Sequence, residues 1–369
     1  MTTTAHAAVL HEVDGPFVFE DVVLGDITPD EVLVRIVATG LCHTDLAVVH
    51  GHIPTQLPMV LGHEGAGVVE EVGSSVTGLE KGDHVAISFA SCGHCSNCLV
   101  GREAYCRNFM LLNMGGVRED GSRTMTAADG DDVRGSFFGQ SSFATHAIVA
   151  ARNAVKIDDG VPLELVGPLG CGIQTGAGTV LNTLALPAGS TIVVAGTGAV
   201  GLSAIMAAKA AGATTIIALD VLDERLSFAT ELGATHTING RTADVEAEIL
   251  AITDGVGAPY AVDTTAVPAV VAQLVAATSF GASIALVGVP KPDATIPLGL
   301  VSGSGKTIIG AIEGDSVPQV FIPRLLAMHA AGDFPFDRMV TTYPFTDIDT
   351  AIADTQSGAA VKAVLTMPV

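Results

Sequence analysis

The hexapeptide Gly196-Thr197-Gly198-Ala199-Val200-Gly201 decides the fold. It follows the apolar run Thr191 to Ala195 and opens the Ala-rich run that ends at Ala211. The first run is typical of a buried strand and the second of a helix. Three glycines at this spacing allow a tight turn, close approach of the backbone to a pyrophosphate, and close packing of helix on strand. The helix start also offers free N–H groups to phosphates. The stretch therefore predicts a dinucleotide-binding βαβ unit.

The strand after this helix ends in an acidic residue at the spacing expected for ribose recognition. The run Thr214 to Asp220 places Asp220 19 residues after Gly201. A carboxylate there can accept hydrogen bonds from both hydroxyls of an adenosine ribose, and it would repel a 2′-phosphate. The pattern favours NAD over NADP as the cofactor.

Outward from this unit, apolar and helical runs alternate as far as about residue 312. The further runs are Asp223 to Leu232, Ala258 to Asp263 and Ser283 to Val287. Such alternation is typical of a doubly wound parallel sheet with helices on both faces.

The first half of the chain has a different character, because short β-branched runs are separated there by Gly and Pro. We expect strands of a mainly β domain at Glu31 to Val37, Gly67 to Val72, Asp83 to Ser88 and Ala144 to Val149. A helix at Val317 to Ala331 and a strand at Val361 to Met367 should rejoin this domain, and Asn113 to Gly135 should form a long surface loop or inserted lobe.

Length and composition exclude several classes of protein. A chain of 369 residues exceeds one domain of about 100 to 200 residues, so two domains are expected. The formal net charge of -22 argues against nucleic acid as a partner. Without the basic start of a signal peptide or an apolar stretch of about 20 residues, we expect a cytoplasmic protein with no membrane partner. In that reducing compartment the six cysteines should be metal ligands or buried side chains.

A second Gly-rich segment, Gly299 to Thr307, must be weighed as a nucleoside triphosphate loop. Leu300 stands where that motif needs Gly, and the apolar strand-like run Thr307 to Ile312 follows where the motif needs a helix. Both differences argue against an NTPase.

Four of the cysteines lie close together in the spacing C-x2-C-x2-C-x7-C, at Cys92, Cys95, Cys98 and Cys106. Four neighbouring thiolates suit a closed tetrahedral zinc site, which anchors a loop and leaves no open position for chemistry. His94 is an alternative ligand, although a solvent-facing position suits it better. We predict a structural zinc ion here.

The other two cysteines, Cys42 and Cys171, each lie beside a glycine, and His63 belongs to another glycine-rich segment. Alone, either cysteine would more often be a small buried side chain. Two thiolates and one imidazole, however, form a three-ligand set with an open fourth position, as in the catalytic zinc site of alcohol dehydrogenase. A zinc ion there could bind an alcohol oxygen and lower its pKa.

The segment Gly62-His63-Glu64-Gly65-Ala66-Gly67, with Gly73 and Val76, reproduces the pattern G-H-E-x-x-G-x5-G-x2-V. This pattern identifies a resemblance to the zinc-dependent medium-chain alcohol dehydrogenases, and the resemblance extends over essentially the whole chain. The chain is most similar to the aryl (benzyl) alcohol dehydrogenases. The resemblance implies an α/β protein with a GroES-like, mainly β catalytic domain at 1–172 and 313–369 and a Rossmann NAD-binding domain at 173–312. It implies reversible hydride transfer between a primary alcohol and NAD, with one catalytic and one structural zinc ion per chain.

The resemblance also assigns the residues of the catalytic centre. The catalytic zinc would be bound by Cys42, His63 and Cys171, with Glu64 as an occasional ligand. Asp45 would orient the imidazole, because such outer partners fix a histidine ligand. Thr44 would hydrogen-bond the substrate oxygen, and a role as a helix cap is its alternative.

Further residues would contact the cofactor by resemblance. The NAD site would comprise Gly196, Gly198, Val200, Gly201, Asp220 and Val287. His43 would face the pyrophosphate, Thr175 the nicotinamide, Arg225 the adenosine ribose and Lys362 a phosphate. Arg225 and Lys362 could equally be ordinary surface charges.

Ala47 departs from the family, in which many members carry a histidine that ends the proton relay at the surface. Histidine is the side chain that changes its charge near neutral pH. Our hypothesis is that His43 replaces the missing base, directly or through the ribose hydroxyls.

Aromatic and aliphatic residues align with the family's substrate channel: Phe89, Phe137, Phe138, Val289 and Ile312. They favour an aryl or bulky primary alcohol, although each phenylalanine could be simple core. Two alternatives remain, a glutathione-dependent formaldehyde dehydrogenase and a catalytically silent structural member of the fold. The long segment Asn113 to Gly135 resembles the dimeric branch, which favours a homodimer over a tetramer.

Overall fold

The glycine hexapeptide joins strand β10 (Thr191–Ala195) to helix α5 (Ala199–Ala210), as predicted. Gly196 has a φ of +85°, in the left-handed region that favours glycine, and a Cβ there would collide with Thr264. A Cβ on Gly201 would collide with the carbonyl oxygen of Gly196. Both glycines are therefore required by the turn and by the packing of α5 on the strand.

The structure, a computed structural model, describes residues 3–130, 132–291 and 293–368. The chain divides into two units: unit 1 runs to Cys171 and adds Val317–Pro323 and the residues from Asp337 onward, and unit 2 comprises Gly172–Ser316 and Arg324–Phe336. Residues 324–336, which we expected in the first domain, group with unit 2. The predicted domain boundaries stay a prediction.

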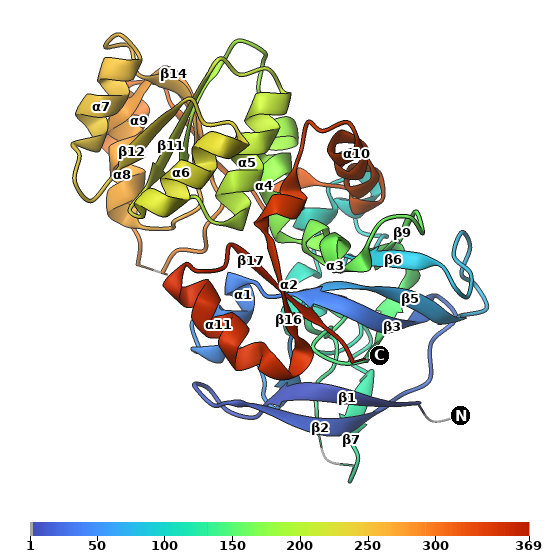
Figure 1. Ribbon diagram of the computed structural model, residues 1–369. Helices are drawn as coiled ribbons and strands as arrows, with labels where there is room; N and C mark the ends of the chain where they lie inside the picture. Colours follow the sequence, from blue (N-terminus) through green and yellow to red (C-terminus); the bar gives the residue numbers. More distant parts are fainter. Residues whose placement is uncertain (1–2, 131, 292, 369) are drawn as a thin grey trace. The chain divides into compact units, whose positions relative to one another are not determined.

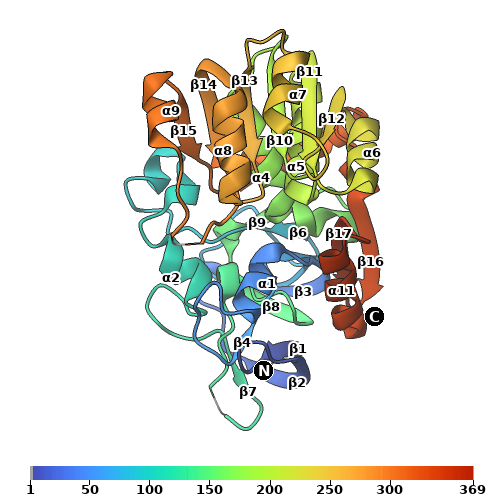
Figure 2. The same cartoon turned by 90° about the vertical axis from the view of Figure 1, so that its left-hand side faces the viewer.

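Unit 2 is a doubly wound parallel sheet. Its strands lie in the order β12-β11-β10-β13-β14-β15. The bounds are β11 Thr215–Asp220, β12 His236–Asn239, β13 Ala258–Asp263, β14 Thr278–Leu286 and β15 Thr307–Gly310. Helices α5 and α6 (Asp223–Leu232) cover one face, and α7 (Val245–Ile252), α8 (Pro268–Ala277) and α9 (Leu298–Gly303) cover the other (Figures 1 and 2). The reversal of strand order beside β10 confirms the predicted fold class.

The second Gly-rich segment is not a phosphate loop. Helix α9 ends before Lys306 and strand β15 follows it, so no helix begins at the Gly-Lys pair. The Lys306 ammonium donates to the carbonyl oxygen of Val275. Its charge is therefore engaged within unit 2.

Unit 1 contains two sheets. A seven-stranded sheet runs β16-β17-β3-β5-β6-β9, with β8 paired to β3, and a four-stranded sheet runs β4-β1-β2-β7. The larger sheet contains β3 Glu31–Gly40, β5 Glu64–Val72, β6 His84–Ile87, β8 His146–Ala150, β9 Ala154–Ile157, β16 Val340–Pro344 and β17 Lys362–Thr366. The smaller contains β1 Thr3–Leu10, β2 Phe17–Leu24, β4 Met59–Val60 and β7 Met125–Ala127. One continuous apolar core joins residues of both sheets.

Short helices lie between the strands of unit 1: α1 His43–Val49, α2 Phe109–Met114, α3 Leu163–Val166 and α11 Ile348–Ser357. Helix α10 (Pro318–Ala330) follows the predicted helix closely. Among the described residues no helix is both long and apolar enough to cross a membrane.

The segment Asn113 to Gly135 is held more firmly than a surface loop. Its strand β7 pairs with β2, and Arg118 makes a two-pronged ion pair with Glu31 at 2.7 and 3.0 Å. Both side chains are largely buried. The segment is therefore an anchored lobe of unit 1.

Candidate active site

Three predicted ligands meet in unit 1 although they come from distant parts of the chain. Cys42 precedes helix α1, His63 precedes strand β5, and Cys171 follows a short 3-10 turn. Their sulfur and nitrogen atoms all lie within 4.8 Å of one another. Zinc bonds of about 2.0–2.3 Å in a tetrahedron would separate the ligand atoms by about 3.5–3.8 Å, so the cluster suits such an ion.

A buried carboxylate orients this cluster. Asp45 accepts hydrogen bonds from His63 Nδ1 at 3.0 Å and Gly62 N at 3.1 Å through Oδ1, and from Cys42 N at 3.0 Å through Oδ2. Because Nδ1 donates to a carboxylate, the lone pair of His63 is on Nε2. That nitrogen is buried and has no hydrogen-bond partner among the described residues. A metal ion between Nε2 and the two sulfurs would satisfy it.

The electrostatics of the three residues favour a cation at their centre. Burial alone would lower the pKa of His63, but Asp45 and the Cys42 thiolate raise it well above its usual range. The pKa of the Cys42 thiol is lowered well below its usual range, first by the hydrogen bond with Cys171 and then, against the effect of burial, by the charge of His63. A proton or a metal ion can supply the positive charge that the thiolate requires.

Glu64 and Lys362 have a different arrangement from the one we predicted. The Lys362 ammonium donates to Glu64 Oε2 at 2.8 Å, to Glu64 Oε1 at 2.9 Å and to the Leu41 carbonyl at 3.1 Å, and it is buried. Its burial excludes the alternative of an ordinary surface charge, and the predicted contact of Lys362 with a phosphate stays a prediction. Its charge is paired because an isolated ammonium would be costly to bury. Burial raises the pKa of Glu64 to about 7, against the opposing effect of Lys362.

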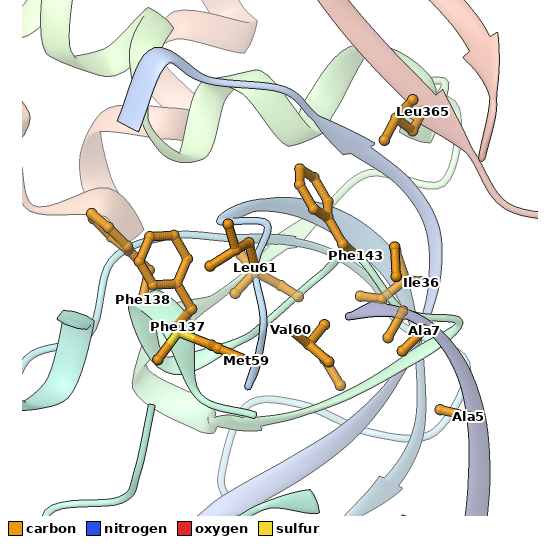
Figure 3. Packing of buried hydrophobic residues seen from close by; sticks show 14 of the residues in the cluster. Ala5, Ala7, Ile36, Met59, Val60, Leu61, Phe137, Phe138, Phe143 and Leu365 are labelled. Atoms are coloured by element: carbon orange, nitrogen blue, oxygen red, sulfur yellow. The ribbon is translucent and has the colours of Figure 1, made fainter. Parts of the chain in front are cut away.

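Aromatic rings pack on the imidazole of His63. The Phe138 ring stacks on it with centroids 4.4 Å apart, and Phe137 meets it edge-on at 5.5 Å. Figure 3 shows the two phenylalanines side by side, next to Leu61. Phe89 is also buried in unit 1. Val289 and Ile312, the other predicted pocket residues, belong to unit 2 and are 71% and 41% exposed.

The predicted proton-transfer residues lie at the start of helix α1. The Thr44 hydroxyl lies 3.8 Å from the Cys42 sulfur, and His43 is exposed. Cys42 is the N-cap residue of the helix, and Asp45 completes the cap by accepting from the Cys42 N–H, so Thr44 does not form it. Thr44 therefore keeps its hydroxyl beside the ligand cluster.

The other four cysteines form a second cluster around which backbone amides converge. The Cys95 and Cys98 sulfurs are 3.5 Å apart and those of Cys92 and Cys98 are 3.9 Å apart, close to the spacing of about 3.8 Å for tetrahedral zinc thiolates. The amides of Cys92 and Cys95 donate to sulfur at 3.3 Å. Backbone N–H groups, of which that of Arg107 has the largest effect, lower the pKa of Cys95 to about 6. His94 stays largely exposed, with Glu119 3.3 Å from Nε2.

The glycine turn and Asp220 lie together at one end of the sheet in unit 2. Asp220 Oδ2 accepts from Thr197 N and Oγ1 at 2.7 and 2.6 Å, and Oδ1 accepts from Val221 N at 2.7 Å. Asp220 therefore ties the glycine turn to the end of β11. Burial lowers the pKa of Arg225, and the charge of Asp220 opposes that shift.

Gly198 lies just before α5, and Val200 lies in its first turn. Thr175 is buried on α4 (Gly172–Gly178), with its hydroxyl 3.4 Å from Glu313. Val287 follows β14 and donates from its N–H to Asp263.

Sequence reasoning missed two buried polar residues at this site, Gln140 and Ser88. The Gln140 amide bonds the peptide groups on both sides of Glu64, directly after His63. A single glutamine or serine carries no motif, so no signal in the sequence points to either residue.

Comparison with known proteins gives consistent matches over the whole chain. Residues 28–159 match the alcohol dehydrogenase GroES-like domain family, and residues 199–329 match the zinc-binding dehydrogenase family. A geraniol dehydrogenase of Castellaniella defragrans is 46% identical, with 98% of this chain and 97% of that protein aligned.

Two solved structures are similar throughout. An alcohol dehydrogenase zinc-binding domain protein from Burkholderia ambifaria is 49% identical, with a TM-score of 0.97 and full coverage of both chains. The benzyl alcohol dehydrogenase of Acinetobacter calcoaceticus is 42% identical, with a TM-score of 0.95, and the alignment covers 99% of this chain and 100% of that one.

Proposed function

The chain belongs to the zinc-dependent medium-chain alcohol dehydrogenase family and is an oxidoreductase, and we propose that it uses NAD to oxidise an aryl or allylic primary alcohol to the aldehyde. The observation that carries the substrate class is the pair of phenyl rings on His63. Flat apolar walls suit an unsaturated substrate. Geraniol and benzyl alcohol, named in two relatives, are an allylic and a benzylic primary alcohol.

Each residue of the candidate site has a role in this reaction. A zinc ion held by Cys42, His63 and Cys171 would act as a Lewis acid on the alcohol oxygen and lower its pKa. Asp45 keeps the proton on His63 Nδ1 and holds the amide of Cys42, so it orients two ligands together. The Thr44 hydroxyl would accept the hydroxyl proton of the substrate as it releases its own proton toward His43, directly or through the ribose hydroxyls, and the exposed His43 would pass that proton to solvent.

Two zinc ions per chain are part of the proposal. The four-cysteine cluster offers four ligands, which fill a tetrahedron and leave no position for a substrate. It would anchor its loop. The three-ligand cluster leaves the fourth position for the alcohol.

The preference for NAD rests on Asp220. Its carboxylate lies at the end of β11, where a 2′-phosphate would add a second negative charge beside it. In NADP-dependent enzymes of this fold a nearby arginine accommodates the 2′-phosphate. Here the charge of Arg225 interacts with the carboxylate of Asp220 instead.

A substrate panel followed at 340 nm tests these proposals. We expect benzyl alcohol and geraniol to have a kcat/KM at least about tenfold above that of ethanol and of cyclohexylmethanol, a saturated alcohol of similar size. A tenfold ratio corresponds to about 1.4 kcal/mol of difference in transition-state binding. NAD should be preferred over NADP. Protein stripped by a chelator should be inactive, and added zinc should restore it.

Other results would contradict particular parts of the proposal. Equal rates with cyclohexylmethanol and benzyl alcohol would refute the unsaturated substrate class. Preference for NADP would refute the role of Asp220. Formaldehyde oxidation that depends on glutathione would favour the formaldehyde dehydrogenase alternative, and no turnover of any alcohol would favour the silent structural one.

A further inference from the structure

We infer that Gln140 is a positioning residue of the catalytic metal site, which acts with Ser88 to hold the segments of His63 and Cys171 at the spacing that the ion requires. This inference rests on the proposed function, because it takes Cys42, His63 and Cys171 as the ligands. Gln140 touches none of the ligating atoms. It acts on the backbone that carries them.

The side-chain amide of Gln140 is fully buried and spans the two peptide groups that flank Glu64, directly after His63. Its Oε1 accepts from Gly65 N at 2.9 Å, and its Nε2 donates to the His63 carbonyl at 2.9 Å and lies 3.5 Å from the Ser88 carbonyl. A buried amide that lost these bonds would leave peptide groups unsatisfied. Gln140 therefore fixes the start of β5 by its backbone, whereas Asp45 binds the His63 ring and the Gly62 N–H.

Ser88 continues the connection to the third ligand. The Ser88 hydroxyl donates to the carbonyl of Gly170 at 2.6 Å, and Gly170 directly precedes Cys171. Both residues are buried. Hydrogen bonds thus link the backbone of His63 to that of Cys171 through Gln140 and Ser88, while Asp45 links Cys42 to His63.

The loop that carries Gln140 adopts a backbone conformation that is costly without such contacts. Phe138 and Ser141 have φ angles of +50° and +52°, in the region that non-glycine residues avoid. The Ser141 hydroxyl holds this turn, since it donates to the Val60 carbonyl at 2.6 Å and accepts from Phe137 N at 2.9 Å. The turn places the Gln140 amide against β5 and the two phenylalanine rings against His63.

The space around Gly65 shows how closely the amide approaches. A Cβ on Gly65 would lie 2.9 Å from Gln140 Oε1 and 2.8 Å from Ser142 Cβ. Both distances are too short for a real Cβ contact. Glycine at this position therefore makes room for the amide of Gln140.

Unit 1 offers a matched control in Asn113, a second fully buried amide that binds the backbone. Its Oδ1 accepts from Ala90 N at 2.8 Å, and its Nδ2 donates to the carbonyls of Ala90 and Phe109 at 2.9 and 2.8 Å. Asn113 makes the same kinds of bond as Gln140. Phe109 packs against the four-cysteine cluster, and the three bonds of Asn113 go to Ala90 and Phe109 rather than to the segment of His63.

The test compares three proteins: the wild type, Gln140→Met and the control Asn113→Leu. Methionine has a shape similar to that of glutamine but cannot make the hydrogen bonds of its amide. The catalytic position is loaded with Co²⁺, its absorption spectrum is recorded, and chelator titration gives its affinity. We expect Gln140→Met to shift the cobalt d–d bands and to weaken cobalt binding by about 10–100-fold, the usual effect of losing an outer partner of a ligand. Asn113→Leu should leave the spectrum and this affinity unchanged.

Gln140→Glu adds a finer comparison, because it keeps an acceptor for Gly65 N and loses the donor to the His63 carbonyl. It should weaken cobalt binding as well. If Gln140→Met does not fold, Gln140→Glu and Ser88→Ala provide the same comparison with Asn113→Leu.

The inference would be overturned if the Gln140 variants had the cobalt spectrum and the cobalt affinity of the wild type. An equal shift of the cobalt bands in Asn113→Leu would also overturn it, because that result would indicate a general loosening of unit 1. Failure of the proposed function looks different. In that case wild-type protein would bind cobalt at the three-ligand site and oxidise none of the alcohols, and the spectra would still decide the role of Gln140.

Discussion

At the scale of single residues, Asp45 fixes the imidazole of His63 through one carboxylate oxygen at 3.0 Å. Asp45→Asn keeps the shape and removes the charge that makes the imidazole a stronger ligand. We expect zinc affinity at the three-ligand site to fall by about 10–100-fold. Zinc content after dialysis against a graded series of chelator concentrations measures this.

The control is Asp21→Asn, which alters another carboxylate 3.0 Å from a histidine, His6, where both side chains are exposed. It should retain both zinc ions. Equal zinc retention by Asp45→Asn and the wild type would refute the orienting role of Asp45.

His43 carries the hypothesis about proton release. It is exposed on helix α1, one turn before Ala47. We expect His43→Gln to alter the pH profile of kcat/KM for alcohol oxidation, because glutamine cannot take up the proton that the substrate releases. His52→Gln, which changes another histidine after the same helix, serves as the control. A profile unaltered by His43→Gln would contradict the hypothesis.

At the scale of elements, the lobe from Asn113 to Gly135 is anchored to β3 by the ion pair of Arg118 and Glu31. Breaking a buried pair leaves one charge unpaired and costs about 3–5 kcal/mol. We expect Arg118→Met to open the lobe and to make residues 113–135 a preferred site of limited proteolysis. Mass spectrometry of the fragments identifies the cleavage.

Arg35→Met is the control. Arg35 forms an ion pair with Glu70 at 3.5 Å in which both side chains are exposed. Exposed pairs contribute about 0–1 kcal/mol, so this variant should be cleaved at the wild-type rate. Similar cleavage in both variants would show that the anchor contributes nothing.

The contact between β16 and α11 predicts a pH dependence. Burial, and then the hydrogen bond to Asp354 at 2.8 Å, raises the pKa of Tyr343 to about 12. An unfolded tyrosine has a pKa of about 10, so the neutral phenol stabilises the fold fully below pH about 10, and this contribution is lost as the pH rises toward 12.

Alkaline titration at 295 nm should show one tyrosine ionising near pH 12. Tyr343→Phe should remove that step, and Tyr260→Phe should leave it in place. A late step that persists in Tyr343→Phe would assign it to another residue.

At the scale of the whole molecule, we propose a homodimer, for which unit 2 offers a surface. Strand β15 ends its sheet with no partner on its outer side within the described chain, and Leu298 and Leu300 on α9 are 70% and 50% exposed. Open edges and exposed apolar side chains favour association. Light scattering should give twice the 37.4 kDa of one chain.

Leu298→Lys should shift that equilibrium toward the monomer. Val320→Lys, at a position in unit 1 that is 69% exposed, should not. A tetramer, or a monomer at micromolar concentration, would contradict the proposal.

The sequence by itself determined the elements whose pattern is local. The glycine hexapeptide, helix Asp223–Leu232 and strand Ala258–Asp263 lie where they were predicted, because their periodicity and turn residues act over a few positions. The start of β5 was placed three residues late. Glu64–Ala66 pair with β3, and that pairing overrides a glycine-rich sequence of weak strand propensity.

The spacing of the four loop cysteines also predicted their cluster, because those residues are close in the chain and the structure brings them together. Only the tertiary structure decided which residues from distant parts of the chain support the cluster of Cys42, His63 and Cys171. Gln140 lies 77 residues after His63, and Lys362 pairs with Glu64 across 298 residues. Contacts of this kind leave no periodicity or motif, because they depend on how β3, β5, β17 and the loops pack around one core. The candidate ligands and Asp45 could therefore be predicted from residue type, spacing and family pattern, whereas the contacts of Gln140 and the pairing of Lys362 with Glu64 could not.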